Sequence, residues 1–259
     1  MKGSSDSSHK TTEMEKIKIQ KYFTDCGILS RRAAEKEISD GKVKVNGEVA
    51  EVGMRIAPQR DRVEYKGRVI RPETDERLCI MLHKPAGYVT TLSDEKGRKN
   101  VTELVSNVGV RLYPIGRLDM NSEGLLLMTN DGELANRLTH PRHEIPKIYR
   151  VTVKGDLTDE KLSLLTSPLL IDGYRIRPVS VSVKERDEKN KTALLEMELF
   201  EGRNRQIRKM CEIADLRVAR LCRIAYGKLT LSTLPSGKWR KLSTYEIEYL
   251  RGERKSPKQ

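Results

Sequence analysis

A short polar loop at residues 116–124 (GRLDMNSEG) leads directly into the apolar run 125–128. A run this apolar is expected to be a buried strand, so the loop before it is held at the edge of a core. Rigid support beneath an irregular loop is how a reactive side chain is fixed in place. Asp119, flanked by Arg117 and Asn121, is therefore the predicted site carboxylate. The alternative is that Asp119 only caps a turn, which is a common role of aspartate.

A second candidate segment, 201–211, carries four positive charges within seven residues. Apolar side chains at 207, 210, 211 and 214 have the i, i+3, i+4, i+7 spacing of one buried helix face. Arg208 lies beside that face, and we expect it to reach inward to a carboxylate, because arginine keeps its charge when buried and can bind both oxygens. Arg203, Arg205 and Lys209 are predicted to contact phosphates. The alternative is a basic helix face that is merely solvated.

Weaker signals lie around these two segments. His140 and His143 have no third ligand at a metal-binding spacing, so a surface turn is favoured over a metal site. Tyr149 fits either a half-buried strand aromatic, which the sequence alone favours, or a platform on which a base stacks. Ser122 lacks the G-x-S-x-G context of a hydrolase nucleophile. The segment 84–88 (KPAGY) is typical of a strand end followed by a turn.

The elements expected to position these residues fall into two parts. In the first, a helical pattern runs from residue 17 to the glycine at 27, and Ser30 can N-cap a second helix over 31–39. Valines alternate with lysines at 42–45, and Asn46-Gly47 then tolerates the positive φ angles of a tight hairpin turn. A small module with two helices and a hairpin is predicted to end near residue 70.

Residues 71–76 are charged and contain a proline, which indicates a linker. Residues 77–251 combine strand-like segments at 78–82, 125–129, 149–153 and 192–200 with helices near 133–139, 159–165 and 204–214. These elements do not alternate as regular βαβ units, so we predict an α+β domain with a largely antiparallel sheet. Residues 1–15 and 252–259 are expected to be a disordered leader and a disordered tail.

Composition narrows the class of protein. The 259 residues carry a net charge of +13, which is typical of a protein with a polyanionic partner, although a solvated surface could also account for it. No run of about 18 apolar residues is present, so no membrane span is expected, and the polar N-terminus does not resemble a signal peptide. Four scattered cysteines without a C-x-x-C pair favour a reducing cytoplasm.

Together these motifs resemble the RsuA/RluB-type ribosomal RNA pseudouridine synthases. The resemblance rests on IGRLD at 115–119 continuing through GLLLMTNDGELA at 124–135, on EGRNRQIRKM at 201–210, and on the shorter KPAG at 84–87 and KIY at 147–149. The segment 16–70 resembles an S4 RNA-binding domain through residues 19–22, 27–35 and 42–47. Several separate motifs in one order make the resemblance specific, and it covers about residues 16–250.

The resemblance implies that a uridine in folded RNA is flipped out and isomerised to pseudouridine. It implies that Asp119 is the essential group, acting as a nucleophile on the base or sugar or as a base in a glycal route, and the sequence leaves these routes open. It further implies that Arg208 orients the carboxylate, that Tyr149 stacks on the flipped uracil, and that Arg117 fills the gap in the RNA stack. Neither a metal nor an organic cofactor is implied.

The expected partner is ribosomal RNA, as naked RNA or within a ribosome assembly intermediate, bound by a monomer. The RNRQ form of the second motif and the KWRKL sequence at 238–242 look more like the large-subunit enzymes. A non-catalytic RNA-binding protein with the same fold is the alternative, and the intact Asp119 motif argues against it. The first module is expected to contribute a basic patch to RNA binding, consisting of Lys18, Lys21, Arg31, Arg32, Lys42 and Lys44.

The excess positive charge is concentrated at the C-terminal end. Residues 201–259 carry 15 basic and 6 acidic side chains, a net charge of +9, whereas residues 1–76 carry 16 and 14, a net charge of +2. We therefore expect the catalytic domain itself to supply much of the attraction for phosphates.

Overall fold

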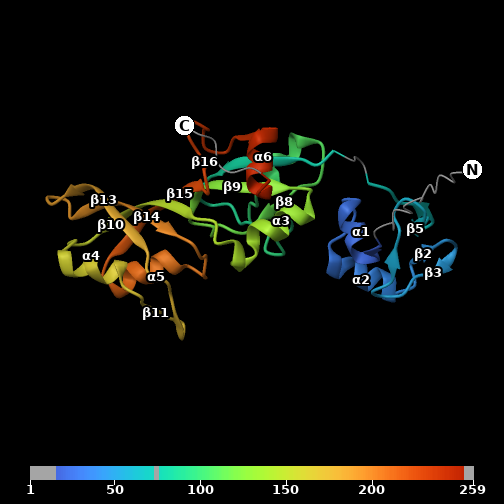
Figure 1. Cartoon of the computed structure of the whole chain (residues 1–259), viewed down its shortest axis with the longest axis horizontal. Helices are drawn as coiled ribbons and strands as arrows, with labels where there is room; N and C mark the ends of the chain where they lie inside the picture. Colours follow the sequence, from blue (N-terminus) through green and yellow to red (C-terminus); the bar gives the residue numbers. More distant parts are fainter. Residues whose placement is uncertain (1–15, 73–75, 254–259) are drawn as a thin grey trace, which may run out of the picture. The chain divides into compact units, whose positions relative to one another are not determined.

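The computed structural model describes residues 16–72 and 76–253, and it divides into two compact units, 1–75 and 76–259 (Figure 1). The predicted leader at 1–15, the centre of the predicted linker at 73–75 and most of the predicted tail, 254–259, lie outside the described residues. None of the helices in the described ranges has the length and apolar composition needed to span a bilayer.

Within residues 16–72, the first unit contains two helices and two small sheets. Strands β3-β2-β5-β6 form one antiparallel sheet, and β1 pairs with β4 in the other. Its elements are β1 (Ile17–Lys18), α1 (Ile19–Asp25), α2 (Arg31–Ser39), β2 (Val43–Val45), β3 (Glu48–Val49), β4 (Arg55–Ile56), β5 (Val63–Tyr65) and β6 (Arg68–Val69).

Local sequence signals explain most of this unit. The Ser30 hydroxyl accepts a hydrogen bond from the Ala33 N–H at 3.2 Å, as predicted for an N-cap. Asn46 and Gly47 both have positive φ, 54° and 94°, in the β2–β3 turn, which confirms the predicted hairpin. Residues 17 and 18, predicted to begin the first helix, instead form β1, because pairing with β4 there outweighs the helical pattern.

The second unit is built on a nine-stranded sheet in the order β13-β14-β10-β15-β9-β7-β17, with β8 added to β9 and β16 to β15. Every strand pair is antiparallel except β9 with β15. The strands are β7 (Cys79–Lys84), β8 (Tyr113–Ile115), β9 (Glu123–Thr129), β10 (Lys147–Lys154), β13 (Ser180–Asp187), β14 (Thr192–Leu199), β15 (Arg217–Tyr226), β16 (Leu229–Thr230) and β17 (Trp239–Lys241). The predicted α+β class and largely antiparallel sheet are confirmed.

The helices of this unit cover opposite ends of the sheet. In Figure 1, α4 and α5 lie along β10, β13 and β14, whereas α3 and α6 lie near β8 and β9. The remaining elements are the helices α3 (Gly132–Thr139), α4 (Asp159–Thr166), α5 (Gln206–Ile213) and α6 (Thr244–Arg251), the 3-10 turns η1 (Glu103–Val108) and η2 (Pro141–His143), and the hairpin β11 (Leu170–Ile171) with β12 (Tyr174–Arg175).

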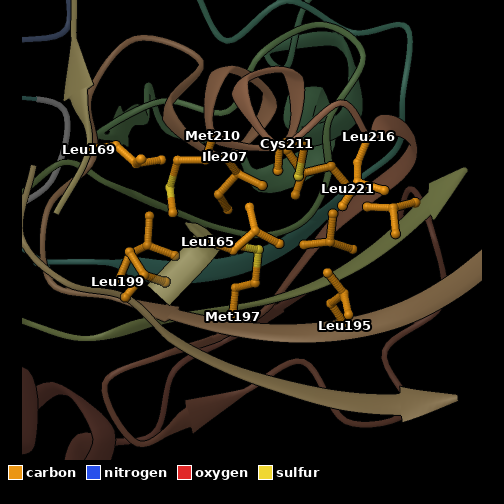
Figure 2. Close-up of a cluster of buried hydrophobic side chains, with 14 of the residues drawn as sticks. Leu165, Leu169, Leu195, Met197, Leu199, Ile207, Met210, Cys211, Leu216 and Leu221 are labelled. Atoms are coloured by element: carbon orange, nitrogen blue, oxygen red, sulfur yellow. The ribbon is translucent and has the colours of Figure 1, made fainter. Parts of the chain in front are cut away.

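The predicted apolar face of α5 is buried against the sheet. Ile207, Met210 and Cys211 are at most 5% exposed, and Figure 2 shows these side chains packed toward Leu195 and Met197 of β14. Burial of a large apolar side chain contributes about 1.5–3 kcal/mol, so this contact fixes the position of α5. The basic residues at the start of the helix are thereby held at one edge of the sheet.

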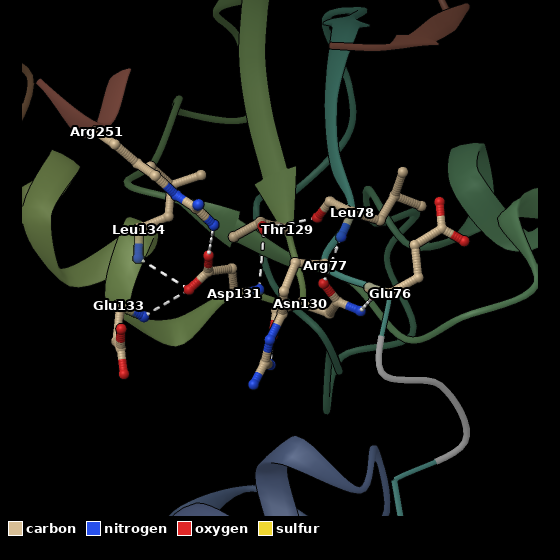
Figure 3. Close-up of polar contacts among 9 residues, drawn as sticks. All are labelled: Glu76, Arg77, Leu78, Thr129, Asn130, Asp131, Glu133, Leu134 and Arg251. Carbon is tan, nitrogen blue, oxygen red and sulfur yellow. Dashed lines mark hydrogen bonds and ion pairs between the residues drawn. The ribbon is translucent and has the colours of Figure 1, made fainter. Parts of the chain in front are cut away.

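Polar contacts join the C-terminal helix α6 to the start of α3 (Figure 3). The Asp131 carboxylate accepts hydrogen bonds from the N–H groups of Glu133 and Leu134, which makes it the N-cap of α3. Its other oxygen accepts a hydrogen bond from Arg251 of α6 at 2.8 Å. Burial alone would raise the pKa of Asp131, but these hydrogen bonds outweigh it and lower that pKa below its usual range.

Candidate active site

Asp119 lies in a cavity of about 290 Å³ that both predicted site segments line. Its carboxylate is half-buried on the loop before β9, and Ser122 on the same loop also lines the cavity. Arg117 and Leu118 of this loop line the cavity as well. The remaining lining residues come from β10 and β14, from the segment before α5, and from α5 and β15: Tyr149, Leu199, Glu201, Gly202, Arg203, Asn204, Arg205, Gln206, Ile207 and Leu221. Residues more than 80 positions apart in the sequence thus surround one carboxylate.

A buried lysine holds the Asp119 loop from below. Lys84, at the end of β7, is fully buried, and its ammonium donates to the backbone carbonyls of Asp119 at 3.0 Å, Ser122 at 2.7 Å and Pro85 at 3.0 Å. Burial lowers the pKa of Lys84 to about 8, and the charges of Asp119 and Glu123 oppose that shift. The amine is therefore still mostly charged at neutral pH and ties the loop to the sheet.

The loop is also fixed by its neighbours on either side. The Thr90 hydroxyl donates to the Leu118 carbonyl at 2.6 Å, and the Ser122 N–H donates to the Asp119 carbonyl at 3.0 Å. Gly124, at φ 109°, lies so close to β15 that a Cβ atom would be 2.2 Å from the Arg223 carbonyl oxygen. A glycine is required here because β9 and β15 approach each other at the point where the loop enters the sheet.

The Arg208 side chain reaches the same loop from α5, but it contacts the backbone of the loop and not the Asp119 carboxylate. Its Nη2 donates to the carbonyl of Asn121 at 2.8 Å, whereas its Nε is buried without a hydrogen-bond partner. The expected ion pair with the Asp119 carboxylate is not among the ion pairs of the described ranges. The carboxylate is nevertheless near enough to favour the charged guanidinium, while burial lowers the pKa of Arg208. Arg208 thus combines a structural contact with a nearby positive charge.

The turn before α5 is organised by Glu201 and Gln206. Gln206, only 3% exposed, donates from Nε2 to the Glu201 carboxylate at 3.1 Å and accepts at Oε1 from the Arg203 N–H at 3.1 Å. Arg205 has a positive φ of 52° at the N-cap of α5. This turn leaves Arg203 and Arg205 exposed at the rim of the cavity, where we predicted phosphate contacts.

Tyr149 is half-buried in β10 and lines the cavity. It can therefore be both a half-buried strand aromatic and a platform on which a base stacks. Its ring packs against two of the hydrophobic clusters of this unit. Arg117 is exposed at the cavity wall, on the residue just after a glycine of positive φ. Asp119 therefore has an aromatic ring and an arginine near it, which suits the binding of a planar base.

Some of the predicted RNA-binding residues form ion pairs with carboxylates, and others are exposed. Lys209 is engaged by the carboxylate of Asp172. In the first unit, the ammonium of Lys21 pairs with Asp25 at 2.9 Å, and that of Lys42 pairs with Glu37 and Asp40. The other members of the predicted patch are exposed on the surface of that unit: Lys18, Arg31, Arg32 and Lys44.

The sequence did not reveal two parts of the site. The KPAG motif by itself predicts only a strand end and a turn, whereas the pairing of β7 with β9 places Lys84 beneath the Asp119 loop. The sequence argues only that Ser122 is not a hydrolase nucleophile, and the structure adds that it lines the cavity with a buried hydroxyl that has no hydrogen-bond partner. His140 and His143 form part of a turn, and no group of three or more potential metal ligands occurs within 16–72 and 76–253.

Comparison with known proteins gives matches over nearly the whole chain. A family model described as RNA pseudouridylate synthase matches residues 78–213, and an S4 domain model matches residues 27–61. The ribosomal large subunit pseudouridine synthase B of Bacillus subtilis (strain 168) is 40% identical over 235 residues, which cover 90% of this chain and 95% of that protein.

Two further matches extend this similarity. An uncharacterized RNA pseudouridine synthase of Aquifex aeolicus (strain VF5) is 38% identical over 239 residues, covering 92% of this chain and 94% of that protein. A crystal structure of a pseudouridylate synthase has a TM-score of 0.61 and 26% sequence identity, and the match covers 90% of this chain and 99% of that one.

Proposed function

The chain belongs to the RNA pseudouridylate synthase family, and from that premise we propose that it isomerises a uridine of large-subunit ribosomal RNA. The family expected from the motifs is confirmed, and the chain is an RNA pseudouridine synthase. The name of the Bacillus subtilis relative and the RNRQ form of the second motif support large-subunit RNA as the substrate. The proposed substrate form is ribosomal RNA itself or a ribosome assembly intermediate.

The observation that carries the proposal is the position of Asp119 in a cavity shared by both motifs. We assign Asp119 as the catalytic group for breaking the N-glycosidic bond and rejoining uracil to the ribose through C5. No atom is gained or lost in this isomerisation. A carboxylate beside the sugar stabilises positive charge that develops on the ribose, whichever route the reaction takes.

The neighbouring residues have supporting roles in this proposal. Tyr149 stacks on the flipped uracil, and Arg117 occupies the gap that the base leaves in the RNA stack. Arg208 acts on the Asp119 loop through the Asn121 carbonyl and by its nearby positive charge. The chemistry assigned to these side chains requires neither a metal nor an organic cofactor.

RNA binding is assigned to both units. We propose that residues 16–70 act as an S4 RNA-binding domain, that 71–76 link it to the second domain, and that 77–251 form the catalytic domain. Arg203 and Arg205 at the cavity rim, together with Lys209 on α5, are then proposed to contact the phosphates beside the target uridine. The protein is proposed to act as a monomer in the cytoplasm, where the four buried cysteines stay reduced.

The proposed substrate is tested by mapping pseudouridine in ribosomal RNA from cells with and without the gene. We expect at least one pseudouridine of large-subunit RNA to disappear in the deletion strain and to return when the gene is supplied. Small-subunit RNA and transfer RNA are mapped in the same cells as comparisons. Loss of a pseudouridine from small-subunit RNA or transfer RNA alone would overturn the large-subunit assignment.

A further inference from the structure

A second cavity, of about 340 Å³, lies beside the one that holds Asp119. The two cavities share the wall formed by Glu201, Gly202 and Arg203. The rest of the second cavity is lined from the end of α3, the segment between η2 and β10, the start of β10, and the residues in and just after β12 and just after β14, among them Lys147, Tyr174, Arg177 and Phe200. Its volume is similar to that of the first cavity, so each can accept a group of the same size.

Two aromatic side chains of the second cavity are unusually exposed. Phe200 is 44% exposed and Tyr174 is 40% exposed, although most large apolar side chains of this unit are buried. The guanidinium carbon of Arg203 lies 3.0 Å from the centre of the Tyr174 ring. Exposed aromatic rings and an arginine plane are the surfaces on which unpaired bases stack.

Among the described residues that line the second cavity, Lys147 is a cation with no carboxylate partner. Arg177 pairs with Glu144 at 2.6 Å, and the Glu201 carboxylate accepts hydrogen bonds from Gln206 and from the Arg177 N–H. Lys147 has no carboxylate partner within 16–72 and 76–253, and its ammonium lies 5.4 Å from the centre of the Tyr226 ring. Burial and the nearby Arg223 lower the pKa of Lys147 to about 8, so an anion beside it would stabilise its charge.

We propose that the second cavity binds the nucleotide next to the target uridine in the same RNA strand, with its base on Phe200 and on the stacked Arg203–Tyr174 pair and its phosphate at Lys147. This inference rests on the proposed function, because it places the target uridine in the Asp119 cavity. Because the two cavities share the wall at Arg203, a strand whose uridine occupies the first cavity would bring its neighbouring nucleotide to the exposed rings and the Lys147 ammonium of the second. The enzyme then recognises two unpaired nucleotides rather than one.

The test measures initial rates on a short fragment of ribosomal RNA that contains the mapped uridine. Phe200→Ala is expected to raise the half-saturating RNA concentration about 10-fold, since base stacking on an aromatic ring accounts for a factor of this order. The rate at saturating RNA is expected to change less than about two-fold, because the ring does not touch the reacting atoms. Ile213→Ala is the matched control, with an apolar side chain of similar exposure (46%) outside both cavities.

Fragments in which one neighbour of the target uridine is replaced by an abasic nucleotide identify the occupant. On the abasic fragment that removes the bound base, wild type and Phe200→Ala are expected to have the same half-saturating concentration. Equal values for Phe200→Ala and Ile213→Ala on the intact fragment would overturn the proposal, and so would a Phe200→Ala defect that persists on both abasic fragments.

Lys147→Met gives a second measurement in the same fragment. Loss of one phosphate contact is expected to reduce the salt dependence of RNA binding by about one unit of slope, whereas Lys154→Met at the other end of β10 is expected to leave it unchanged. An unchanged slope for Lys147→Met would contradict the phosphate contact. The salt dependence of Lys147→Met and Lys154→Met is a measurement of RNA binding and requires no catalysis. It therefore separates a failure of this proposal from a failure of the catalytic assignment of Asp119.

Discussion

The ammonium of Lys84 donates to the backbone carbonyl of Asp119 at 3.0 Å, so a fully buried charge lies directly beneath the proposed catalytic carboxylate. The same ammonium binds the Ser122 carbonyl three residues further on. One side chain from β7 thereby fixes both ends of the turn that carries Asp119, which makes the geometry of the site depend on a residue outside its cavity.

Lys84→Met is expected to lower both stability and activity. Removing the ammonium takes away the donor to the Ser122 and Pro85 carbonyls, while the Asp119 carbonyl keeps its hydrogen bond from the Ser122 N–H. The cost is about 1–3 kcal/mol for each buried carbonyl left without a donor, partly offset because burying the charge is itself unfavourable. Chemical denaturation and single-turnover pseudouridine formation measure the two effects. A variant with the free energy of unfolding and the rate of wild type would show that Lys84 does not hold the loop.

Gly124→Ala is expected to destabilise the catalytic domain by more than about 2 kcal/mol, because the new methyl group would meet the Arg223 carbonyl and the residue has a positive φ. Gly202→Ala is the control for stability, since a Cβ there meets nothing within 4 Å. The difference in urea midpoint between the two variants measures the effect. Equal midpoints would mean that β9 and β15 can separate at this point without cost.

Asp131→Asn is expected to destabilise the protein by about 1–2 kcal/mol at neutral pH through loss of the charged cap of α3 and the contact with Arg251. The pKa of Asp131 is lowered in the folded state, so its contribution is complete above the ordinary aspartate pKa and is lost as pH falls through the folded value. Urea unfolding of both proteins from pH 7 to pH 3 should show the difference shrinking below about pH 4. A difference that is constant over this range would contradict the prediction.

The basic rim of the catalytic domain is expected to supply more of the salt dependence of RNA binding than the first unit. Replacing Arg203 and Arg205 together by Gln should reduce the slope of log affinity against log salt by about two units. Replacing Arg31 and Arg32 by Gln should have a smaller effect, because acidic side chains offset most of the charge of that unit. A larger reduction in slope for the Arg31 and Arg32 substitutions would show that the first unit makes most of the phosphate contacts.

The sequence predicted the helix caps, turns and helix faces that depend on residues close together in the chain. Ser30 caps its helix, Asn46-Gly47 makes the hairpin turn, and the spacing of Ile207 and Met210 marks the buried face of α5. The helix α6 was not predicted, although Ser243 and Glu246 have the spacing of a capping box, which the structure contains. That signal was present in the sequence and could have located the helix.

The relationships that were not predicted depend on contacts between distant segments. The parallel pairing of β9 with β15 brings Gly124 against Arg223, nearly 100 residues away. Arg208 was expected to bind a carboxylate, whereas its hydrogen bond goes to the Asn121 carbonyl, because the position of α5 on the sheet decides which loop atom its guanidinium reaches. Neither contact follows from spacing along the chain.

The catalytic assignment of Asp119 is tested most directly by single-turnover formation of pseudouridine by Asp119→Asn. This substitution keeps the shape of the side chain and removes its charge. With the mapped ribosomal RNA fragment, we expect the variant to bind the RNA as wild type does but to lose more than about 10³-fold in rate. Asp159→Asn, an exposed carboxylate on α4, should retain full activity. Pseudouridine formation by Asp119→Asn at the wild-type rate would contradict the assignment of Asp119 as the catalytic group.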